Sequence, residues 1–157
     1  MRSKDQPLVT PARLSESLCF TIYSANLAFG KVYRPILDEL GLTYPQYITI
    51  VALWEASPQT VGDLGEKLFL ETNTLTPILK RLQLMGYLER QRDPKDERRV
   101  LVSLTRSGRQ LRERALSKDL VKATGLEPGA FAEVQKAISK LRMNLNRPSQ
   151  LRLAEPD

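Results

Sequence analysis

The sequence predicts a mainly α-helical protein with one small β-hairpin, an α+β fold class. Apolar residues recur at helical spacing along most of the 157 residues. Two short runs of β-type residues, GYLERQ and RRVLVSLT, stand close together after residue 85. A charged turn at residues 92–98, RDPKDER, joins these runs, and their spacing predicts a hairpin.

The composition is that of a folded domain, because 41% of the residues are hydrophobic and 27% are charged. A net charge of +6, from 24 basic and 18 acidic residues, favours polyanionic partners without naming one. Histidine is absent, which removes the commonest metal ligand and the commonest general base at neutral pH. The sequence also has no Gly-rich phosphate loop, nucleophile elbow or Cys/His cluster. We therefore expect no conventional enzyme, no metal and no cofactor.

The single cysteine, Cys19, cannot form an intramolecular disulfide, and residues 1–17 lack the apolar core of a signal peptide. We therefore expect a cytoplasmic protein with a reduced thiol. The longest apolar-rich run, YITIVALW at 47–54, is far shorter than the roughly 18 residues that a spanning helix needs. No membrane partner is expected.

The first helix is predicted from Leu14 to Leu40, because apolar residues keep a helical period over this stretch until Gly41 ends it. A second helix is predicted over 44–56, with Pro45 in its first turn.

Thr60 and Asp63 have the spacing of a capping box, which predicts a short helix through about Leu68. The next helix is expected from Thr72 to Thr74 onward, with Pro77 in or near its first turn, until Gly86 stops it. Its buried side is predicted to consist of five apolar residues: Leu75, Ile78, Leu79, Leu82 and Met85.

Beyond Thr105 the chain returns to helix. The last helical segment has apolar residues spaced 3, 4, 3 and 4: Phe131, Val134, Ile138, Leu141 and Leu145. Such a seam usually faces another helix, and in a short chain we expect that partner to be a second copy of the protein. The sequence therefore predicts an intertwined homodimer.

Two short helices followed directly by a basic hairpin predict a winged helix-turn-helix. The second helix must bury its apolar side, so seven residues are expected to face outward: Thr72, Asn73, Thr74, Thr76, Pro77, Lys80 and Arg81. Short polar side chains let a helix approach base edges in the DNA major groove, and cations meet phosphates. The alternative is an ordinary solvated helix face, and the five basic residues within 90–99 argue against it.

From Cys19 to about Thr105 the sequence resembles the MarR family of winged-helix regulators, and within it the OhrR branch, which senses organic hydroperoxides. Four stretches carry the resemblance: LCF at 18–20, LTYPQY at 42–47, TLTPILKRL at 74–82, and DER at 96–98 followed by RVLVSLT. The last two helices match only in general pattern.

The resemblance implies that Arg98 enters the DNA minor groove at the wing tip and that Asp96 orients it. It implies major-groove and phosphate contacts for residues 72–77 and for Arg81, and we add Arg99 to the predicted DNA-binding set. Because a dimer presents two recognition helices, the expected partner is double-stranded DNA with a near-palindromic operator.

Cys19 has no cationic neighbour in the sequence, so stabilisers of its thiolate must come from elsewhere. In OhrR-like proteins tyrosine hydroxyls supply them, and Tyr23, Tyr33 and Tyr44 stand at the matching places. Fourteen residues of helix separate Tyr33 from Cys19 by about 21 Å along the axis, so the two can meet only between crossing helices of two copies. The alternatives are an inert, packed cysteine and tyrosines that merely fill the core.

The sequence thus predicts a repressor that leaves its operator when an organic hydroperoxide oxidises Cys19. With no second cysteine, the sulfenic acid must be trapped by a small thiol or a backbone nitrogen, or be oxidised further. One alternative is a MarR-type regulator released by small aromatic ligands. Another is a thiol peroxidase. A peroxidase must turn over, and a chain with one cysteine and no histidine has no built-in means of resolving its sulfenic acid.

The expected organisation is a flexible N-terminal arm, one MarR-type domain and a flexible tail, over residues 1–12, 13–146 and 147–157. Within the domain, dimerisation helices at about 13–40 and 106–146 flank the winged helix-turn-helix at about 44–105.

Overall fold

The computed structural model describes residues 13–115 and 120–147. By its internal contacts the chain divides into two units, Met1–Lys118 and Asp119–Asp157, each of which is described by itself. The expectation of a single domain over 13–146 stays a prediction.

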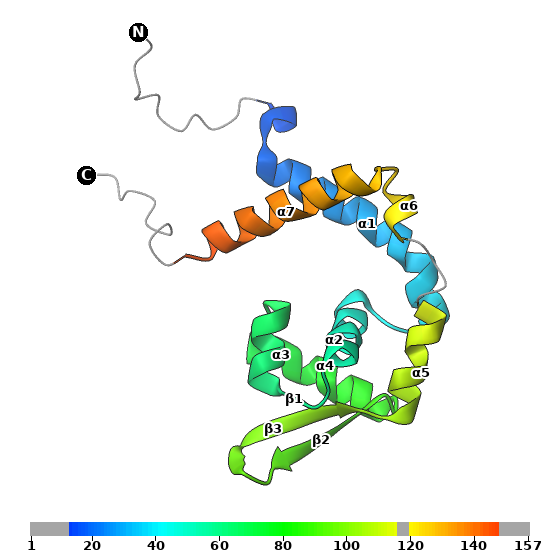
Figure 1. The fold of residues 1–157 in the computed structure, drawn as a ribbon, viewed down its shortest axis with the longest axis vertical. Helices are drawn as coiled ribbons and strands as arrows, with labels where there is room; N and C mark the ends of the chain where they lie inside the picture. Colours follow the sequence, from blue (N-terminus) through cyan, green and yellow to red (C-terminus); the bar gives the residue numbers. More distant parts are fainter. Residues whose placement is uncertain (1–12, 116–119, 148–157) are drawn as a thin grey trace, which may run out of the picture. The chain divides into compact units, whose positions relative to one another are not determined.

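The first unit is mostly helical and carries the sheet (Figure 1). Its elements are, in order, the 3-10 turn η1 (Leu14–Glu16), α1 (Leu18–Leu40), α2 (Tyr44–Glu55), β1 (Gln59–Thr60), α3 (Val61–Leu68), α4 (Thr72–Leu84), β2 (Leu88–Asp93), β3 (Asp96–Leu104) and α5 (Arg106–Ala115). The second unit contains α6 (Leu120–Ala123) and α7 (Pro128–Leu145). The predicted fold class, mainly α with a small β-wing, is confirmed.

The first helix begins later than its apolar periodicity predicts. Leu14–Glu16 form a 3-10 turn, and Ser17 is the N-cap of α1 because its hydroxyl accepts a hydrogen bond from the amide of Phe20 at 3.2 Å. This cap satisfies an amide that has no partner inside the helix, so the helix starts here. Cys19 consequently lies in the first turn of α1.

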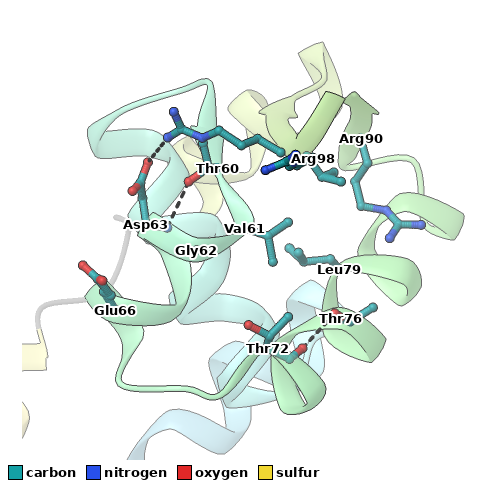
Figure 2. A pocket seen from close by; sticks show the side chains of 12 residues that line it. Thr60, Val61, Gly62, Asp63, Glu66, Thr72, Thr76, Leu79, Arg90 and Arg98 are labelled. Carbon is teal, nitrogen blue, oxygen red and sulfur yellow. Dashed lines mark hydrogen bonds and ion pairs between the residues drawn. The ribbon is translucent and has the colours of Figure 1, made fainter. Parts of the chain in front are cut away.

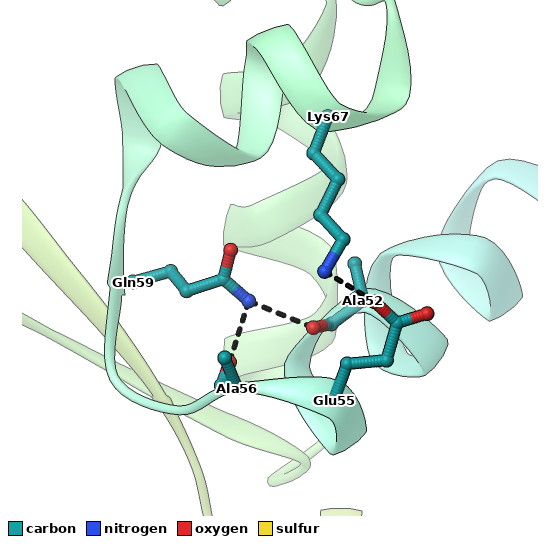
Figure 3. Close-up of polar contacts among 5 residues, drawn as sticks. All are labelled: Ala52, Glu55, Ala56, Gln59 and Lys67. Carbon is teal, nitrogen blue, oxygen red and sulfur yellow. Dashed lines mark hydrogen bonds and ion pairs between the residues drawn. The ribbon is translucent and has the colours of Figure 1, made fainter.

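Strand β1 was not predicted, because two residues are too few to show alternation. Gln59 and Thr60 pair antiparallel with Val102 and Leu101, which gives a three-stranded sheet of order β1-β3-β2. The side-chain amide of Gln59 donates to the carbonyl oxygens of Ala52, at 2.7 Å, and of Ala56 (Figure 3). These bonds hold the end of α2 beside the sheet.

Helices α2 and α3 are also joined by an ion pair between Lys67 and Glu55 (Figure 3). The core of the first unit is made by side chains from α2, α3, α4 and the sheet that are almost fully buried: Ile50, Leu53, Leu64, Leu75, Leu79, Leu82, Leu88 and Val102. Three of the five residues predicted for the buried side of α4 are therefore in the core, while Ile78 and Met85 are half-buried.

The turn between α3 and α4 is short and tightly packed. The Thr60 hydroxyl accepts from the amide of Asp63 at 3.1 Å, which is the N-cap half of the predicted capping box. At the other end of α3, Phe69 adopts a left-handed conformation with φ of 56°, and the amide of Leu70 donates to the carbonyl of Gly65 at 2.9 Å. A Cβ on Gly65 would lie 2.9 Å from the carbonyl oxygen of Leu70, so this close turn requires glycine there.

Helix α7 has no buried residue along its described length, Pro128–Leu145. Of the five residues in its predicted seam, Phe131 and Leu141 are half-buried, whereas Val134, Ile138 and Leu145 are exposed. Among residues 13–115 and 120–147, none of the helices has the length and apolar character that crossing a membrane would require.

Candidate functional site

The outer face of α4 presents most of the predicted DNA-reading residues to solvent. Six of them are exposed: Thr72, Asn73, Thr74, Pro77, Lys80 and Arg81. Thr76 differs, because it is half-buried and its hydroxyl donates to the carbonyl oxygen of Thr72 at 2.7 Å. That hydroxyl is therefore turned back onto its own helix.

Pro77 is the sixth residue of α4 and so belongs to its second turn. Having no amide hydrogen, it cannot donate to the carbonyl of Asn73 one turn earlier. The helix nevertheless continues to Leu84, held on the core by Leu79 and Leu82.

Two aspartates shape the tip of the wing, the hairpin formed by β2 and β3. The carboxylate of Asp93 accepts from the amide of Lys95 at 2.9 Å, and that of Asp96 accepts from the amide of Arg98 at 3.1 Å. Arg92 donates from its guanidinium to the carbonyl oxygen of Glu97 at 2.9 Å. Asp96 thus orients the backbone of Arg98, whose side chain is exposed.

A hollow of about 530 Å³ lies between the start of α4, helix α3 and the wing (Figure 2). Three arginines line it: Arg90, Arg98 and Arg99. Two carboxylates, Asp63 and Glu66, also line the hollow and offset part of this charge. Oδ2 of Asp63 lies 4.0 Å from Nη2 of Arg99. The hollow brings the wing and the helix face together in one positively charged surface.

Arg90 is a member of this surface that sequence reasoning missed. Its Nε donates to Oε1 of Gln83, in the last turn of α4, at 2.7 Å. The signal available in the sequence was its place among the five basic residues of the hairpin, but the contact with Gln83 depends on how β2 packs.

The candidate thiol, Cys19, is exposed in the first turn of α1. Tyr23, one turn further along, is 60% exposed. Tyr33 lies in the C-terminal half of the same helix, fourteen residues beyond Cys19.

The structure places two of the three predicted tyrosines together. The rings of Tyr33 and Tyr44 are 5.1 Å apart between centroids, at 66°. Two residues not predicted for the site extend this contact: Tyr47 lies 6.0 Å from Tyr33, and Trp54 lies 6.3 Å from Tyr47. Their sequence signal was the spacing of three and seven residues along α2, which places them on one face of the helix.

Burial raises the pKa of the Tyr33 phenol, and the neighbouring Tyr44 and Tyr47 raise it further. Burial raises the pKa of Tyr47 in the same way, with Tyr44 as the second cause. These hydroxyls therefore keep their protons at neutral pH and are available as hydrogen-bond donors.

Comparison with known proteins agrees with this architecture. The family model for the transcriptional regulators SarA and Rot matches residues 31–115. The organic hydroperoxide resistance transcriptional regulator of Bacillus subtilis is 45% identical over 104 residues, which span 66% of this chain and 71% of that protein.

Two solved structures of AbfR, a protein of Staphylococcus epidermidis, are similar along most of the chain. Reduced AbfR bound to DNA has a TM-score of 0.72 at 33% identity, covering 86% of this chain and 96% of AbfR. Overoxidised AbfR bound to DNA has a TM-score of 0.65 at 36% identity, covering 82% and 96%. The matched segment includes the helix-turn-helix, the wing and the tyrosine cluster, and this chain belongs to the winged-helix MarR/SarA-type family of transcriptional regulators.

Proposed function

We propose that this protein is a homodimeric, DNA-binding repressor that senses organic hydroperoxides through Cys19. The observation that carries the proposal is an exposed thiol in the first turn of a helix, in a chain whose α4 and wing form a basic surface for DNA. The similarity to the Bacillus subtilis organic hydroperoxide regulator supports the nature of the signal.

The reaction proposed for Cys19 is a two-electron oxidation. The thiolate sulfur attacks the terminal oxygen of a hydroperoxide ROOH, an S–O bond forms, and the O–O bond breaks. The alkoxide leaves and takes a proton to become the alcohol ROH. Sulfur is oxidised to sulfenic acid while the peroxide is reduced.

The proposed assembly is an intertwined dimer. In the single chain, side chains of α1 such as Leu27 and Phe29 are 51% and 47% exposed, and three residues of the α7 seam are exposed as well: Val134, Ile138 and Leu145. Covering these faces with a second copy removes apolar surface from water. Crossing α1 helices would also bring Tyr33 and Tyr44 of one copy near Cys19 of the other, together with Tyr23.

The proposed DNA contacts are made by α4 in the major groove and by the wing in the minor groove. On α4 and at the wing tip they are the residues predicted from the sequence: Thr72, Asn73, Thr74, Thr76, Pro77, Lys80, Arg81, Asp96, Arg98 and Arg99. Exposure of this face beside the arginine-lined hollow supports the proposal, with Asp96 acting on the backbone of Arg98.

The decisive experiment is a DNA titration with and without tert-butyl hydroperoxide, on a near-palindromic duplex selected by the reduced protein. Wild-type protein should release DNA on oxidation, and Cys19→Ser should bind equally well but not release. Mass spectrometry should identify the oxidation product, because AbfR is bound to DNA in its overoxidised form as well as when reduced. If Cys19→Ser still responds to peroxide, the thiol is a bystander, and a regulator released by aromatic ligands becomes the better description.

We also propose that oxidation is stoichiometric rather than catalytic, which separates a sensor from a thiol peroxidase. When no small thiol is added, each chain should consume one equivalent of hydroperoxide to form the sulfenic acid and one more for each further oxidation step of Cys19, without turnover. The cytoplasmic location expected from the sequence stays a prediction.

A further inference from the structure

A continuous line of contacts runs from the tyrosine cluster to the corner that joins α4 to the wing. It begins with Tyr33 on α1, whose ring lies 6.0 Å from Tyr47 on α2. Tyr47 in turn meets Trp54, at the end of α2, in an edge contact of 6.3 Å and 81°. Three aromatic rings thus connect α1 to the far end of α2.

Trp54 continues the line through a polar contact. Its indole N–H donates to the carbonyl oxygen of Gly108, in the first turn of α5, at 2.9 Å. The amide of Gly108 donates in turn to the hydroxyl of Thr105 at 3.1 Å, and that hydroxyl donates to the carbonyl oxygen of Gly86 at 2.6 Å. One hydroxyl therefore serves as acceptor and donor at once.

Gly86 and Tyr87 form the corner between α4 and β2. Thr105 makes two hydrogen bonds to this corner, because its amide also donates to the carbonyl oxygen of Tyr87 at 3.1 Å. A Cβ on Gly108 would come within 2.1 Å of the same carbonyl oxygen, so α5 is seated directly against the corner. These contacts therefore lie at the joint between α4 and the wing, where a change would alter the angle between the two.

That angle matters for DNA binding, because α4 and the wing must enter neighbouring grooves of one duplex together. Because Trp54 is bonded to Gly108 and Gly108 to Thr105, a small shift of Trp54 would move Gly108 and, through Thr105, the corner. Closely packed contacts leave little room for local adjustment, so a shift at one residue displaces the next residue along the line.

We propose that Trp54 and Thr105 are positioning residues that transmit the state of the tyrosine cluster to the junction of α4 and the wing. This inference rests on the proposed function, in which Tyr33 of one copy lies near Cys19 of the other and so meets the oxidised sulfur. Neither residue touches the thiol or the DNA-reading surface. Their effect lies in the coupling between oxidation and DNA affinity.

Two substitutions each break the line of contacts at one residue with little change of shape: the first removes one hydrogen bond and the second removes two. Trp54→Phe keeps an aromatic ring beside Tyr47 but loses the N–H that bonds Gly108. Thr105→Val keeps the volume of the side chain but loses the hydroxyl. Thr105→Ser is the matched control, because it retains both hydrogen bonds.

The measurement is the ratio of the operator Kd after oxidation to the Kd before it, together with the rate of thiol loss on adding tert-butyl hydroperoxide. The full-length protein is used, with the DNA duplex selected by the reduced wild type. We expect thiol loss at the wild-type rate in all three variants. The Kd ratio should fall about fivefold or more in Trp54→Phe and Thr105→Val, and stay near wild type in Thr105→Ser.

Two results would overturn the inference. If both Kd values rise by the same factor, the ratio is unchanged and the contacts are merely structural. If Trp54→Phe and Thr105→Val behave as wild type throughout, the line carries no coupling. If the wild-type protein loses its thiol but its operator Kd is the same before and after oxidation, the proposed function is refuted. The inference is then refuted with it.

Discussion

The guanidinium of Arg90 donates from Nε to the side-chain oxygen of Gln83 at 2.7 Å, and this bond ties the first strand of the wing to the last turn of α4. A guanidinium has five N–H donors, and the four not used for Gln83 suit a phosphate oxygen. Arg90 is therefore held in a fixed place on the arginine-lined hollow.

Arg90→Ala should weaken operator binding and lower the slope of log K against log salt by about one unit, the value for one lost phosphate contact. Lys136→Ala is the control, since it removes one charge from α7 in the other unit. A binding titration at several salt concentrations decides the point. Equal effects of the two substitutions would mean that Arg90 acts only through net charge.

Substitutions at the wing tip can distinguish the direct contact of Arg98 with DNA from the effect of Asp96 on the backbone of Arg98. Arg98→Ala should lower both affinity and salt slope, because it removes a cation. Asp96→Ala should lower affinity while the salt slope stays the same, because Asp96 holds the amide of Arg98 and contacts no phosphate. Asp96→Asn keeps an acceptor oxygen and should bind nearly as wild type. A loss in Asp96→Asn as large as in Asp96→Ala would contradict the role of the hydrogen bond.

Gly108 provides a test of packing between α5 and the corner of the wing. Gly108→Ala places a methyl group 2.1 Å from a backbone carbonyl, which cannot move as freely as a side chain, and should destabilise the fold by on the order of 3 kcal/mol. Gly129→Ala, on α7, places its methyl group where no other atom lies within 4 Å. It should therefore leave the free energy of unfolding unchanged or raise it by up to about 1 kcal/mol. Urea unfolding of both variants measures the difference. Similar stabilities would show that α5 is loosely seated.

The main elements of the fold could be predicted from the sequence because their signals are local. Apolar spacing, the Thr60 cap and Gly41 mark helices α1 to α4, and alternation beside a charged turn marks the hairpin. Strand β1 and the start of α1 could not be predicted. Strand β1 depends on pairing with β3, more than forty residues away. The start of α1 depends on the Ser17 cap, which begins the helix at Leu18 although the apolar spacing already starts at Leu14.

The candidate site was predictable in its residue types but not in its contacts. The outward face of α4 follows from burying Leu75, Leu79 and Leu82 on its other side. Thr76 was expected to face outward, yet its hydroxyl satisfies a carbonyl of its own helix. Arg90 and Trp54 join the site only through partners that folding brings to them.

Stability should fall at alkaline pH in a way that depends on Tyr33. Burial holds the pKa of Tyr33 above 10.0 in the folded protein, so the unfolded chain releases this proton first as the pH rises. The unfolded state then binds fewer protons, and the free energy of unfolding decreases above about pH 10. The contribution is fully present below that pH.

Tyr33→Phe removes this titrating group and should flatten the alkaline decline. Urea unfolding from about pH 8.5 to about pH 11 provides the measurement. A Tyr33→Phe curve parallel to wild type would show that Tyr33 titrates alike in both states.

Cys19 and Tyr33 lie on one helix but too far apart to meet, and this separation has a genetic consequence. If the sensing pair is completed across two copies, a Cys19→Ser subunit and a Tyr33→Phe subunit carry defects that complement each other. A mixed dimer would hold one intact pair and one doubly altered pair. A cell expressing both alleles should therefore recover a peroxide response that neither allele supports alone, whereas a sensor complete within one chain would give no such recovery.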